Sequence, residues 1–496
     1  MKPEKSPQSG LRRDLGLWPL TATGICAMLG AGINIVPFMI QRNVPGIGPY
    51  VLPAFLVAAV PALLAAFAYA MLSSAMPRAG GSYVYASRAL NPYLGFIASF
   101  SQWFGLSIAI GVISYVIIPF IRDIAVPLDM PDVARFLEQG YVRLSLALLF
   151  LWLFVLVNIR GTRLYAMTLV PLMLLMFGLG AIVIFAGFYF DQQDFATALL
   201  TRESRSLPMT EAPFDISIFL AAAAVLFSSF IGFDAIAQAG GEAKNPKRSL
   251  PLAVGLAILV VGAFYMLFTA AVYHAVPWQF IAAEAQTHDI TAPGLLRYFL
   301  SPGWTAAIVA GAAIALINDL PAMLLAVSRL MFAWAEDRIF PAYFARVHGR
   351  HHTPAVALIA SGCMASVGIV GSHLAGDFFL GVDILVTSML FNFFLMCLAV
   401  IVLPKRNIEL ARAISIVPSV RARLFIGYAG CISLGFFWMI HVWKDLSATT
   451  TAWYFHSTPV WLIVMGIATI VYLLEVRRLR QRGINLDDIF KNLPPE

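Results

Sequence analysis

The chain has few charged residues: lysine, arginine, aspartate and glutamate make up 12% of its 496 residues. A soluble domain carries about 25% charged residues, so this composition excludes an ordinary water-soluble protein. The net charge of +7 comes from basic residues that are scattered over short connecting segments. Because they do not gather on one face, we expect no nucleic acid partner.

Cysteine is also scarce, and the motifs of catalytic sites are missing. The four cysteines, Cys26, Cys363, Cys397 and Cys431, lie in apolar stretches without the spacing of a metal site or of a disulfide framework. The apolar stretches contain no paired acids, no nucleophile beside a base and no nucleotide-binding loop. The sequence therefore predicts no catalytic residues, no bound metal and no cofactor, which argues against an enzyme.

Hydrophobic residues dominate instead, at 60% of the total. Charge-free stretches recur along the chain at about the length of 20 residues that a membrane-spanning helix needs. They predict an all-α integral membrane protein with about twelve transmembrane helices. The expected organisation is a tail at 1–14, five spans over 15–190, five more over 215–404, two over 423–478 and a tail at 479–496. Between the second and third spans, residues 78–88 mix small, aromatic and basic side chains and predict a short helix along the membrane interface.

Lysine and arginine are distributed unequally between the two sides of these spans. If the N-terminus is cytoplasmic, only eight of the 33 basic residues lie on the outer side: Arg42, Arg122, Arg135, Arg143, Arg202, Arg205, Arg297 and Lys444. Cytoplasmic loops carry the excess of basic residues. We therefore predict a multi-pass protein of the inner or plasma membrane with both termini in the cytoplasm. Residues 1–14 have no apolar core, so no cleaved signal peptide is expected.

Two of the predicted spans contain glycines near their middle. Gly30 and Gly32 interrupt the first span, and Gly232 interrupts the sixth. Lipid cannot bond to an unwound backbone, so such breaks survive only where protein buries them or where they line a polar cavity. Each set of five spans opens with a break, and this pattern predicts an inverted repeat with a small-molecule site between the breaks. The alternative is that the small residues only allow close helix packing.

The breaks would expose peptide groups of opposite polarity. A half-helix that begins at Ile33 would present free N–H groups with a partial positive charge, which suit a carboxylate. Carbonyl groups before the second break would accept hydrogen bonds from an ammonium group, with the hydroxyls of Ser228 and Ser229 nearby.

Two aspartates lie at membrane depth. Asp234 follows Gly232 by two residues, and Asp319 lies in the eighth span. A carboxylate there is costly unless it is paired, hydrated or protonated, so both are candidates for proton coupling. Asp319 could instead pair with a cationic group of a substrate. The structural alternatives are that Asp234 binds open backbone N–H groups and that Asp319 caps the backbone freed by Pro321.

Motifs spread from residue 24 to about residue 405 resemble the amino acid-polyamine-organocation (APC) transporter superfamily. They are Gly30-Ala31-Gly32-Ile33, Arg78-Ala79-Gly80-Gly81-Ser82-Tyr83, Gly232-Phe233-Asp234, the stretch 242–251, Glu336-Asp337-Arg338-Ile339-Phe340-Pro341 and Thr353-Pro354. The resemblance implies a LeuT-like fold, in which a 5+5 inverted repeat with broken first and sixth spans is followed by two extra C-terminal helices.

The resemblance also implies where a substrate binds. By position, N–H groups at Ala31 and Gly32 would bind a carboxylate, and carbonyl groups at both breaks would accept from an α-ammonium group. Trp103 of the third span would form part of the wall, and Asp319 would share a helix face with Met323, four residues later. The expected substrate-binding residues are Met28, Gly30, Ala31, Gly32, Ser107, Ser228, Ile231, Asp319 and Met323.

The implied function is secondary transport of an amino acid or a related amine by alternating access. Proton symport is the preferred coupling, with Asp234 or Asp319 as the titrating group, while exchange and sodium symport stay open. Relatives that stack on a guanidinium group carry aromatic residues where this chain has Ser228 and Met323, and one proton-coupled branch carries a lysine that is absent from the fifth span here. A polyamine or other organic cation is an alternative cargo, and a non-transporting nutrient sensor is an alternative of another class. The expected partners are the small-molecule substrate and the lipid bilayer, and the sequence does not indicate an oligomeric state.

Overall fold

The computed structural model describes residues 10–207, 210–287, 289–375, 379–448, 453–484 and 486–494. Within these ranges the regular elements are all helices, and extended pairing is limited to two isolated bridges, Leu15 with Ala243 and Ala79 with Ala239. Eleven helical segments of this part of the chain are long and apolar enough to cross a membrane, and Ile216–Phe230 is a shorter apolar helix. Each predicted span falls on one of these segments. The prediction of an all-α membrane protein is therefore confirmed, while the inverted repeat stays a prediction.

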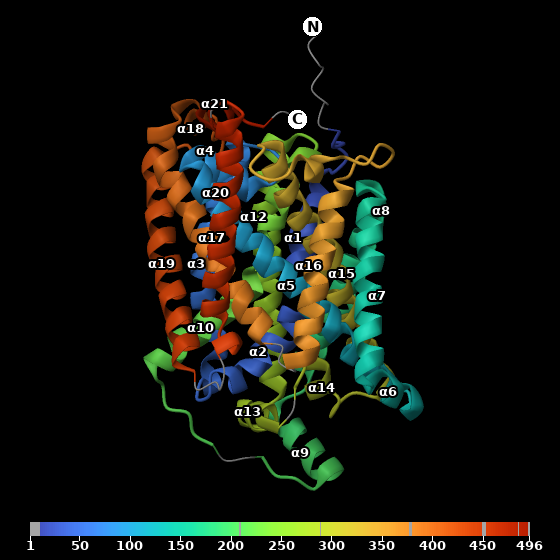
Figure 1. Cartoon of the computed structure of the whole chain (residues 1–496). Coiled ribbons are helices and arrows are strands. Elements are labelled where there is room, and N and C mark those ends of the chain that lie inside the picture. The colour runs from blue at the N-terminus through green and yellow to red at the C-terminus, as the bar shows by residue number, and fades with distance from the viewer. Residues whose placement is uncertain are drawn as a thin grey trace.

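The helices follow one another as a long up-and-down bundle (Figure 1). Their bounds are α1 Leu17–Met28, α2 Ala31–Asn43, η1 Gly48–Tyr50, α3 Val51–Ala75, α4 Gly81–Ala89, α5 Pro92–Ala125, α6 Pro131–Glu138, α7 Gly140–Ile159, α8 Thr162–Tyr189, α9 Gln192–Glu203, α10 Ile216–Leu226, η2 Phe227–Phe230, α11 Asp234–Gln238, η3 Gly240–Glu242, α12 Pro246–Ala275, α13 Trp278–Thr287, α14 Ala292–Leu296, α15 Pro302–Glu336, η4 Ala342–Ala345, α16 Ala355–Ala375, α17 Phe379–Arg406, α18 Ile408–Arg412, α19 Val420–Ser447, η5 Trp453–Phe455, α20 Ser457–Gln481 and α21 Leu486–Lys491.

Both described ends of the chain lie at the same end of the bundle, which we call the terminal end. Figure 1 shows α21 and the first described residues there, whereas α6, α9, α13 and α14 lie at the opposite end. The predicted tails at 1–14 and 479–496 lie partly outside the described residues. An even number of crossings explains why the two ends meet, and the membrane side that they face stays a prediction.

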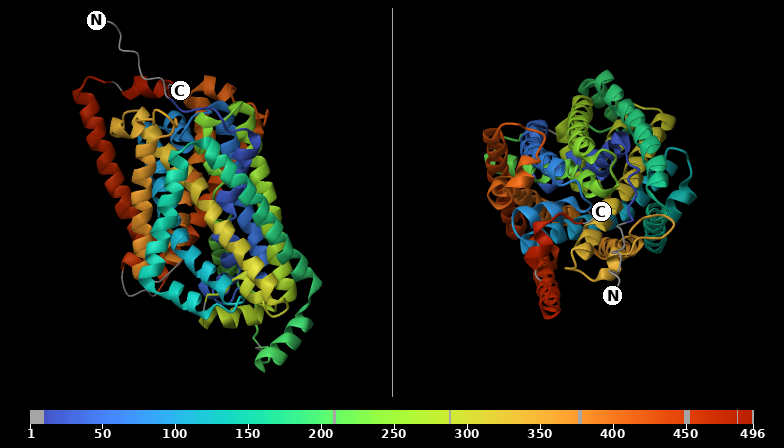
Figure 2. Two further views of the ribbon diagram at one scale, coloured as in Figure 1. Left: turned by 90° about the vertical axis from the view of Figure 1, so that its right-hand side faces the viewer. Right: turned by 90° about the horizontal axis from the view of Figure 1, so that it is seen from above.

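The broken helices occupy the interior of the bundle. In the most apolar stretch of Leu17–Asn43, 94% of the residues are buried, against 28% in the corresponding stretch of α20. Figure 2 shows α20 standing at the edge of the bundle. An interrupted helix leaves backbone groups that lipid cannot satisfy, so it needs this cover, whereas a continuous helix such as α20 can face lipid.

The segment after α3 differs from the expected interfacial helix. All residues of α4 are buried. Tyr83 donates a hydrogen bond of 2.7 Å to Asp337, and Arg88 forms a two-pronged ion pair with the same carboxylate. Gly80, which precedes the helix, has a left-handed φ of 70°. The basic and polar residues of this segment predicted contact with water. In the structure the charge of Arg88 is instead paired with a buried carboxylate, so the segment can be buried at a lower cost.

A second buried ion pair holds the terminal end together. The Arg329 guanidinium on α15 donates to both carboxylate oxygens of Glu242, at 3.1 and 2.6 Å. The backbone of Glu242 in turn accepts from the N–H of Leu15 at 2.9 Å, and Lys244 donates its N–H to the Leu15 carbonyl at 2.7 Å. The chain before α1, the chain after α11 and the end of α15 are thus joined at one point.

Candidate functional site

The first break lies between α1 and α2. The helix α1 ends at Met28, and α2 begins at Ala31 with Gly30 at its N-cap. We expected this half-helix to begin at Ile33, so the structure starts it two residues earlier. The first four N–H groups of a helix have no partner within it, and here they lie at the start of α2, in the middle of a span.

The second break lies between α10 and α11. After α10 the chain passes through η2, extends at Ile231 and turns at Gly232, whose φ is 137°. A Cβ added at Gly232 would overlap the peptide group between Ala27 and Met28 of α1, with the Met28 nitrogen at 2.8 Å. The backbones of the two breaks are therefore in direct contact, which is possible because a glycine stands at the crossing.

A cavity of about 60 Å³ lies between the two breaks. Seven of the predicted substrate-binding residues line it: Met28, Gly30, Gly32, Ser228, Ile231, Asp319 and Met323. The rest of the wall is formed by small and apolar residues: Ala27, Val36, Ala109, Val112, Ile113, Gly381, Val382 and Leu385. Segments that are distant in the sequence thus converge on one cavity with a mostly apolar wall.

Asp319 is the one ionisable residue among the described residues that line this cavity. Its side chain is 2% exposed, and its Oδ1 atom has no hydrogen-bond partner. A Cβ added at Gly30 would overlap the Asp319 carboxyl group, so this group lies directly against the start of α2. A buried carboxylate without a partner is costly, and a proton, a cation or a ligand donor would relieve that cost.

Tyr265 on α12 closes the first break from behind. Its hydroxyl donates a hydrogen bond of 2.9 Å to the carbonyl of Met28, and the hydroxyl oxygen stands where a Cβ on Gly32 would be. Tyr265 was not among the residues predicted from the sequence. The sequence signal that could have identified Tyr265 is its position in the middle of a charge-free span. A buried tyrosine hydroxyl normally has a hydrogen-bond partner, so such a position indicates a buried polar contact.

Two expected wall residues, Ser107 and Trp103, are placed differently. Ser107 is buried on α5 but does not line the cavity, and α5 contributes Val112 and Ile113 instead. Trp103 points toward α16, where its indole N–H donates to the Ser361 hydroxyl at 3.1 Å. Ala31 supplies the first residue of α2, and its side chain lies outside what the structure describes. Ser107 and Trp103 lie outside the cavity because its α5 wall begins at residue 109, at least two residues beyond them.

Asp234 lies at the start of α11, outside the cavity. Its Oδ1 atom accepts from the N–H of Gly232 at 3.2 Å, and its Oδ2 atom accepts from the Gln102 amide. Both carboxylate oxygens are therefore occupied. The two intramembrane aspartates thus differ: Asp234 is fully hydrogen-bonded, whereas Asp319 has an open oxygen beside the cavity.

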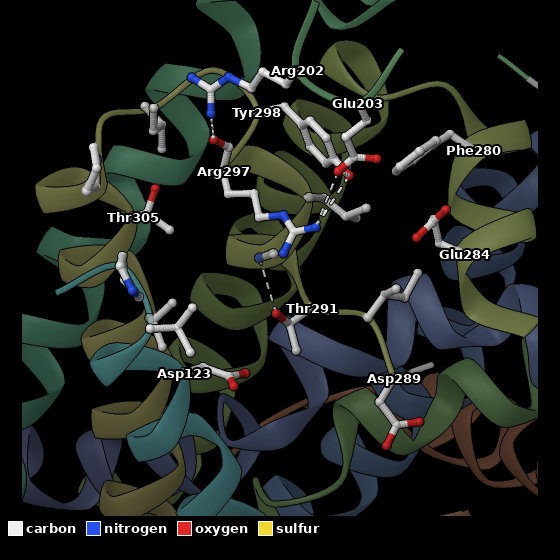
Figure 3. Close-up of a pocket in the computed structure, with 18 of the residues that line it drawn as sticks. Asp123, Arg202, Glu203, Phe280, Glu284, Asp289, Thr291, Arg297, Tyr298 and Thr305 are labelled. Atoms are coloured by element: carbon white, nitrogen blue, oxygen red, sulfur yellow. Dashed lines mark hydrogen bonds and ion pairs between the residues drawn. The ribbon is translucent and has the colours of Figure 1, made fainter. Parts of the chain in front are cut away.

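A larger cavity of about 470 Å³, whose lining is drawn in Figure 3, lies among α9, α13 and α14, which Figure 1 shows at the end of the bundle opposite the termini. All of the described charged side chains that line it, except Arg202, have an oppositely charged partner. Arg205 lies 2.5 Å from Glu284, and this hydrogen bond raises the pKa of the Arg205 guanidinium. Glu203 accepts from the Tyr298 hydroxyl at 2.9 Å. Because these groups neutralise one another, the smaller cavity, with its unpartnered Asp319, is the candidate functional site.

The amino-acid sequence is similar to those of known membrane transport proteins. A family model described as amino acid permease matches residues 15–469. The chain is 27% identical over 384 residues to cationic amino acid transporter 4 of Homo sapiens, which covers 73% of this chain and 56% of the relative. It is 27% identical over 415 residues to the branched-chain amino acid permease BcaP of Bacillus subtilis, covering 82% and 84%. It is 24% identical over 488 residues to the methylthioribose transporter of the same organism, covering 96% and 95%. The chain therefore spans little more than half of the human relative but most of both bacterial ones.

Proposed function

Because this chain belongs to the amino acid permease family, we propose that it is a secondary transporter that moves an amino acid or a related amine across the membrane by alternating access. The observation that carries the proposal is the cavity between the two helix breaks, with the start of α2 in its wall and, at Asp319, a carboxylate oxygen that has no partner. Each break gives its helix a hinge, so the halves on either side of the cavity can tilt separately.

The cavity offers a complementary group for each part of an amino acid. The N–H groups at the start of α2 suit a carboxylate. The carbonyl groups at the breaks suit an ammonium group. Val112, Ile113 and Val382 form an apolar wall that suits an aliphatic side chain. The name of the branched-chain amino acid permease agrees with such a wall.

The position of Asp319 supports proton coupling. Its carboxyl group lies against Gly30, at the place where the substrate carboxylate would bind. Two carboxylates that close repel each other, and a proton on one of them removes the repulsion. Binding of an amino acid would thus require uptake of a proton by Asp319. Asp234 is the second candidate for proton coupling.

We propose that the terminal end of the bundle faces the cytoplasm, as the distribution of basic residues indicates.

An organic cation without a carboxyl group is the second candidate cargo. It is favoured by the same contact between Asp319 and Gly30, because an ionised Asp319 could pair directly with an amine and would occupy the anion position itself. Such a cargo would need no coupled proton. The two candidates therefore differ in whether transport acidifies the compartment that receives the cargo.

Uptake by the purified protein in liposomes distinguishes these candidates. We expect accumulation of at least one labelled amino acid under an inward proton gradient, none under a sodium gradient alone, and competition by analogues only if they keep both the amino and the carboxyl group. Liposomes without protein are the control. Uptake restricted to amines would favour the second candidate. Binding of amino acids without flux under any gradient would contradict transport and favour a sensor.

A further inference from the structure

A network of buried polar side chains joins α3, α4, α5, α11 and α17 behind the second break. None of its described members lines the candidate site, and all are completely shielded from solvent. The members are Tyr69, Ser82, Gln102, Asp234, Gln238 and Asn392. Because polar groups at this depth are expensive unless they bond to one another, a network of six is a specific feature that needs an explanation.

Gln102 of α5 stands at the centre of the network. Its amide N–H₂ group donates to the Oδ2 atom of Asp234. Its carbonyl oxygen accepts from the amide of Gln238 on α11 and from the amide of Asn392 on α17, both at 3.4 Å. One side chain thus contacts the carboxylate on one side and two donors on the other.

The outer members close the network toward α4. Gln238 donates to the Ser82 hydroxyl at 2.7 Å, and Asn392 donates to the Tyr69 hydroxyl at 2.7 Å. The Tyr69 and Ser82 hydroxyls share a hydrogen bond of 2.6 Å. The N–H of Gly80 also donates to the carbonyl of Gln238 at 3.1 Å. The network therefore fixes the start of α4 to the end of α11, next to the terminal end.

An amide has one donating end and one accepting end, and this fixes the direction in which Gln102 points. An ionised Asp234 only accepts, so it takes the N–H₂ end and leaves the oxygen for Gln238 and Asn392. The Oδ1 atom of Asp234 already accepts from Gly232, so a proton would be held at Oδ2. It would then face the Gln102 N–H₂ group, donor against donor. Rotating the Gln102 amide would turn its N–H₂ group toward the donating ends of Gln238 and Asn392, so these amides would have to rotate as well.

A nearby cation could neutralise Asp234, so the buried ionisable groups around α11 matter. On the elements that pack against α11 they are Cys26 on α1, Tyr69 on α3, Tyr83, Tyr85 and Arg88 on α4, Tyr265 on α12, Asp319 and Arg329 on α15, and Glu242 on η3. Arg88 and Arg329 are both taken up by ion pairs, with Asp337 and Glu242. Among the described residues this leaves no free cation to neutralise Asp234, so the species that changes its charge is a proton.

We propose that Gln102 is a positioning residue that couples the protonation state of Asp234 to closure of the terminal end. With Asp234 ionised, both ends of the Gln102 amide are matched and α4 is held to α11. With Asp234 protonated, one hydrogen bond is replaced by a donor–donor contact, and the connection between α4 and α11 loosens. The inference rests on the proposed transport function, because it gives the second aspartate a role in opening one side of the carrier.

Thiol labelling at the contact of α4 with α11 tests this inference. Ala239 is completely buried there and pairs with Ala79, so an Ala239→Cys variant reports whether the contact opens. Labelling is followed by mass spectrometry of that peptide and divided by the labelling rate of a free thiol at the same pH, because only the thiolate reacts. This ratio is expected to be about tenfold higher at mildly acidic than at mildly alkaline pH. Adding Gln102→Met, which keeps the side-chain volume, is expected to make labelling fast at both pH values. Asp234→Asn should have the same effect, without a further change in the double variant.

Gln41 provides a matched control. It is a buried glutamine outside the network, and its amide donates to the Gly48 carbonyl at 2.8 Å. Gln41→Met should leave the pH dependence of labelling intact. The inference is overturned if labelling in the parent variant does not depend on pH, or if Gln102→Met keeps the pH dependence. Uptake by the same preparations separates the two proposals: absence of flux in the unmodified protein contradicts transport, whereas flux with an unchanged pH response in Gln102→Met contradicts only the inference.

Discussion

Asp319→Asn is expected to abolish proton-driven accumulation of an amino acid while substrate binding persists within a few-fold of the unmodified protein. Asparagine keeps the shape of the side chain beside Gly30 but never ionises, so it resembles the protonated aspartate at every pH. A substrate carboxylate could then bind without taking up a proton. Exchange of labelled for unlabelled substrate should continue, but its rate should no longer depend on pH. In the unmodified protein, a single titrating group can change this rate by at most about 100-fold over two pH units.

The measurement combines equilibrium binding with uptake in proteoliposomes with and without a proton gradient. Asp289→Asn is a matched control, because Asp289 is 75% exposed and pairs at the surface with Arg42. It should change uptake less than twofold, about the scale of a surface ion pair. Retained accumulation against a gradient in Asp319→Asn would remove Asp319 from the coupling mechanism. A loss of binding by about 100-fold would instead favour the organic cation, since breaking a buried charge pair costs several kcal/mol.

Gly232→Ala is expected to reduce transport more than about 100-fold, because the strain of a disallowed backbone angle and the steric overlap together cost a few kcal/mol. The added methyl group would enter the peptide group between Ala27 and Met28, and alanine rarely adopts a φ of 137°. The two breaks would have to separate, which would distort the cavity from both sides.

Gly255→Ala is the matched control for this substitution. Gly255 lies within α12, and an added Cβ would meet nothing within 4 Å. Uptake by the two variants is compared after their thermal stability in detergent has been measured, so that loss of transport by a folded protein is separated from misfolding. Transport by Gly232→Ala at the rate of Gly255→Ala would show that contact between the breaks is not needed.

The spans and the positions of both breaks could be predicted from the sequence because their signals are local. A run of apolar residues or a glycine within it is visible in a short window. The start of α2 could not be placed to the residue, since alanine and glycine at 31 and 32 are compatible with either a coil or a first helical turn. The burial of α4 was missed for a different reason: the partner that accommodates Arg88 is Asp337, 249 residues away.

The residues of the candidate site could be predicted where the family resemblance supplied them. Their environments could not be predicted, because these depend on side chains from other helices. Asp234 and Asp319 are alike in the sequence, as acids within apolar spans. Their environments differ because Gln102 reaches Asp234 from another helix, whereas the Oδ1 atom of Asp319 is left open. Tyr265 and Gln102 could not be identified from their own neighbours in the chain, since their roles depend on groups across the bundle.

The proposed mechanism requires a transported substrate to occupy the cavity between the breaks. Val382 lines that cavity from α17, and Ser204 is exposed beyond α9, so cysteines introduced at these positions form a test pair. Because the native Cys363 is also exposed, each introduced cysteine is followed by mass spectrometry of its own peptide. We predict that a saturating concentration of the transported amino acid slows thiol labelling of Val382→Cys more than about tenfold, the change expected when a ligand occupies its site nearly completely. Labelling of Ser204→Cys should not change. Equal labelling rates at Val382→Cys with and without substrate, in a protein that transports, would contradict the proposed site.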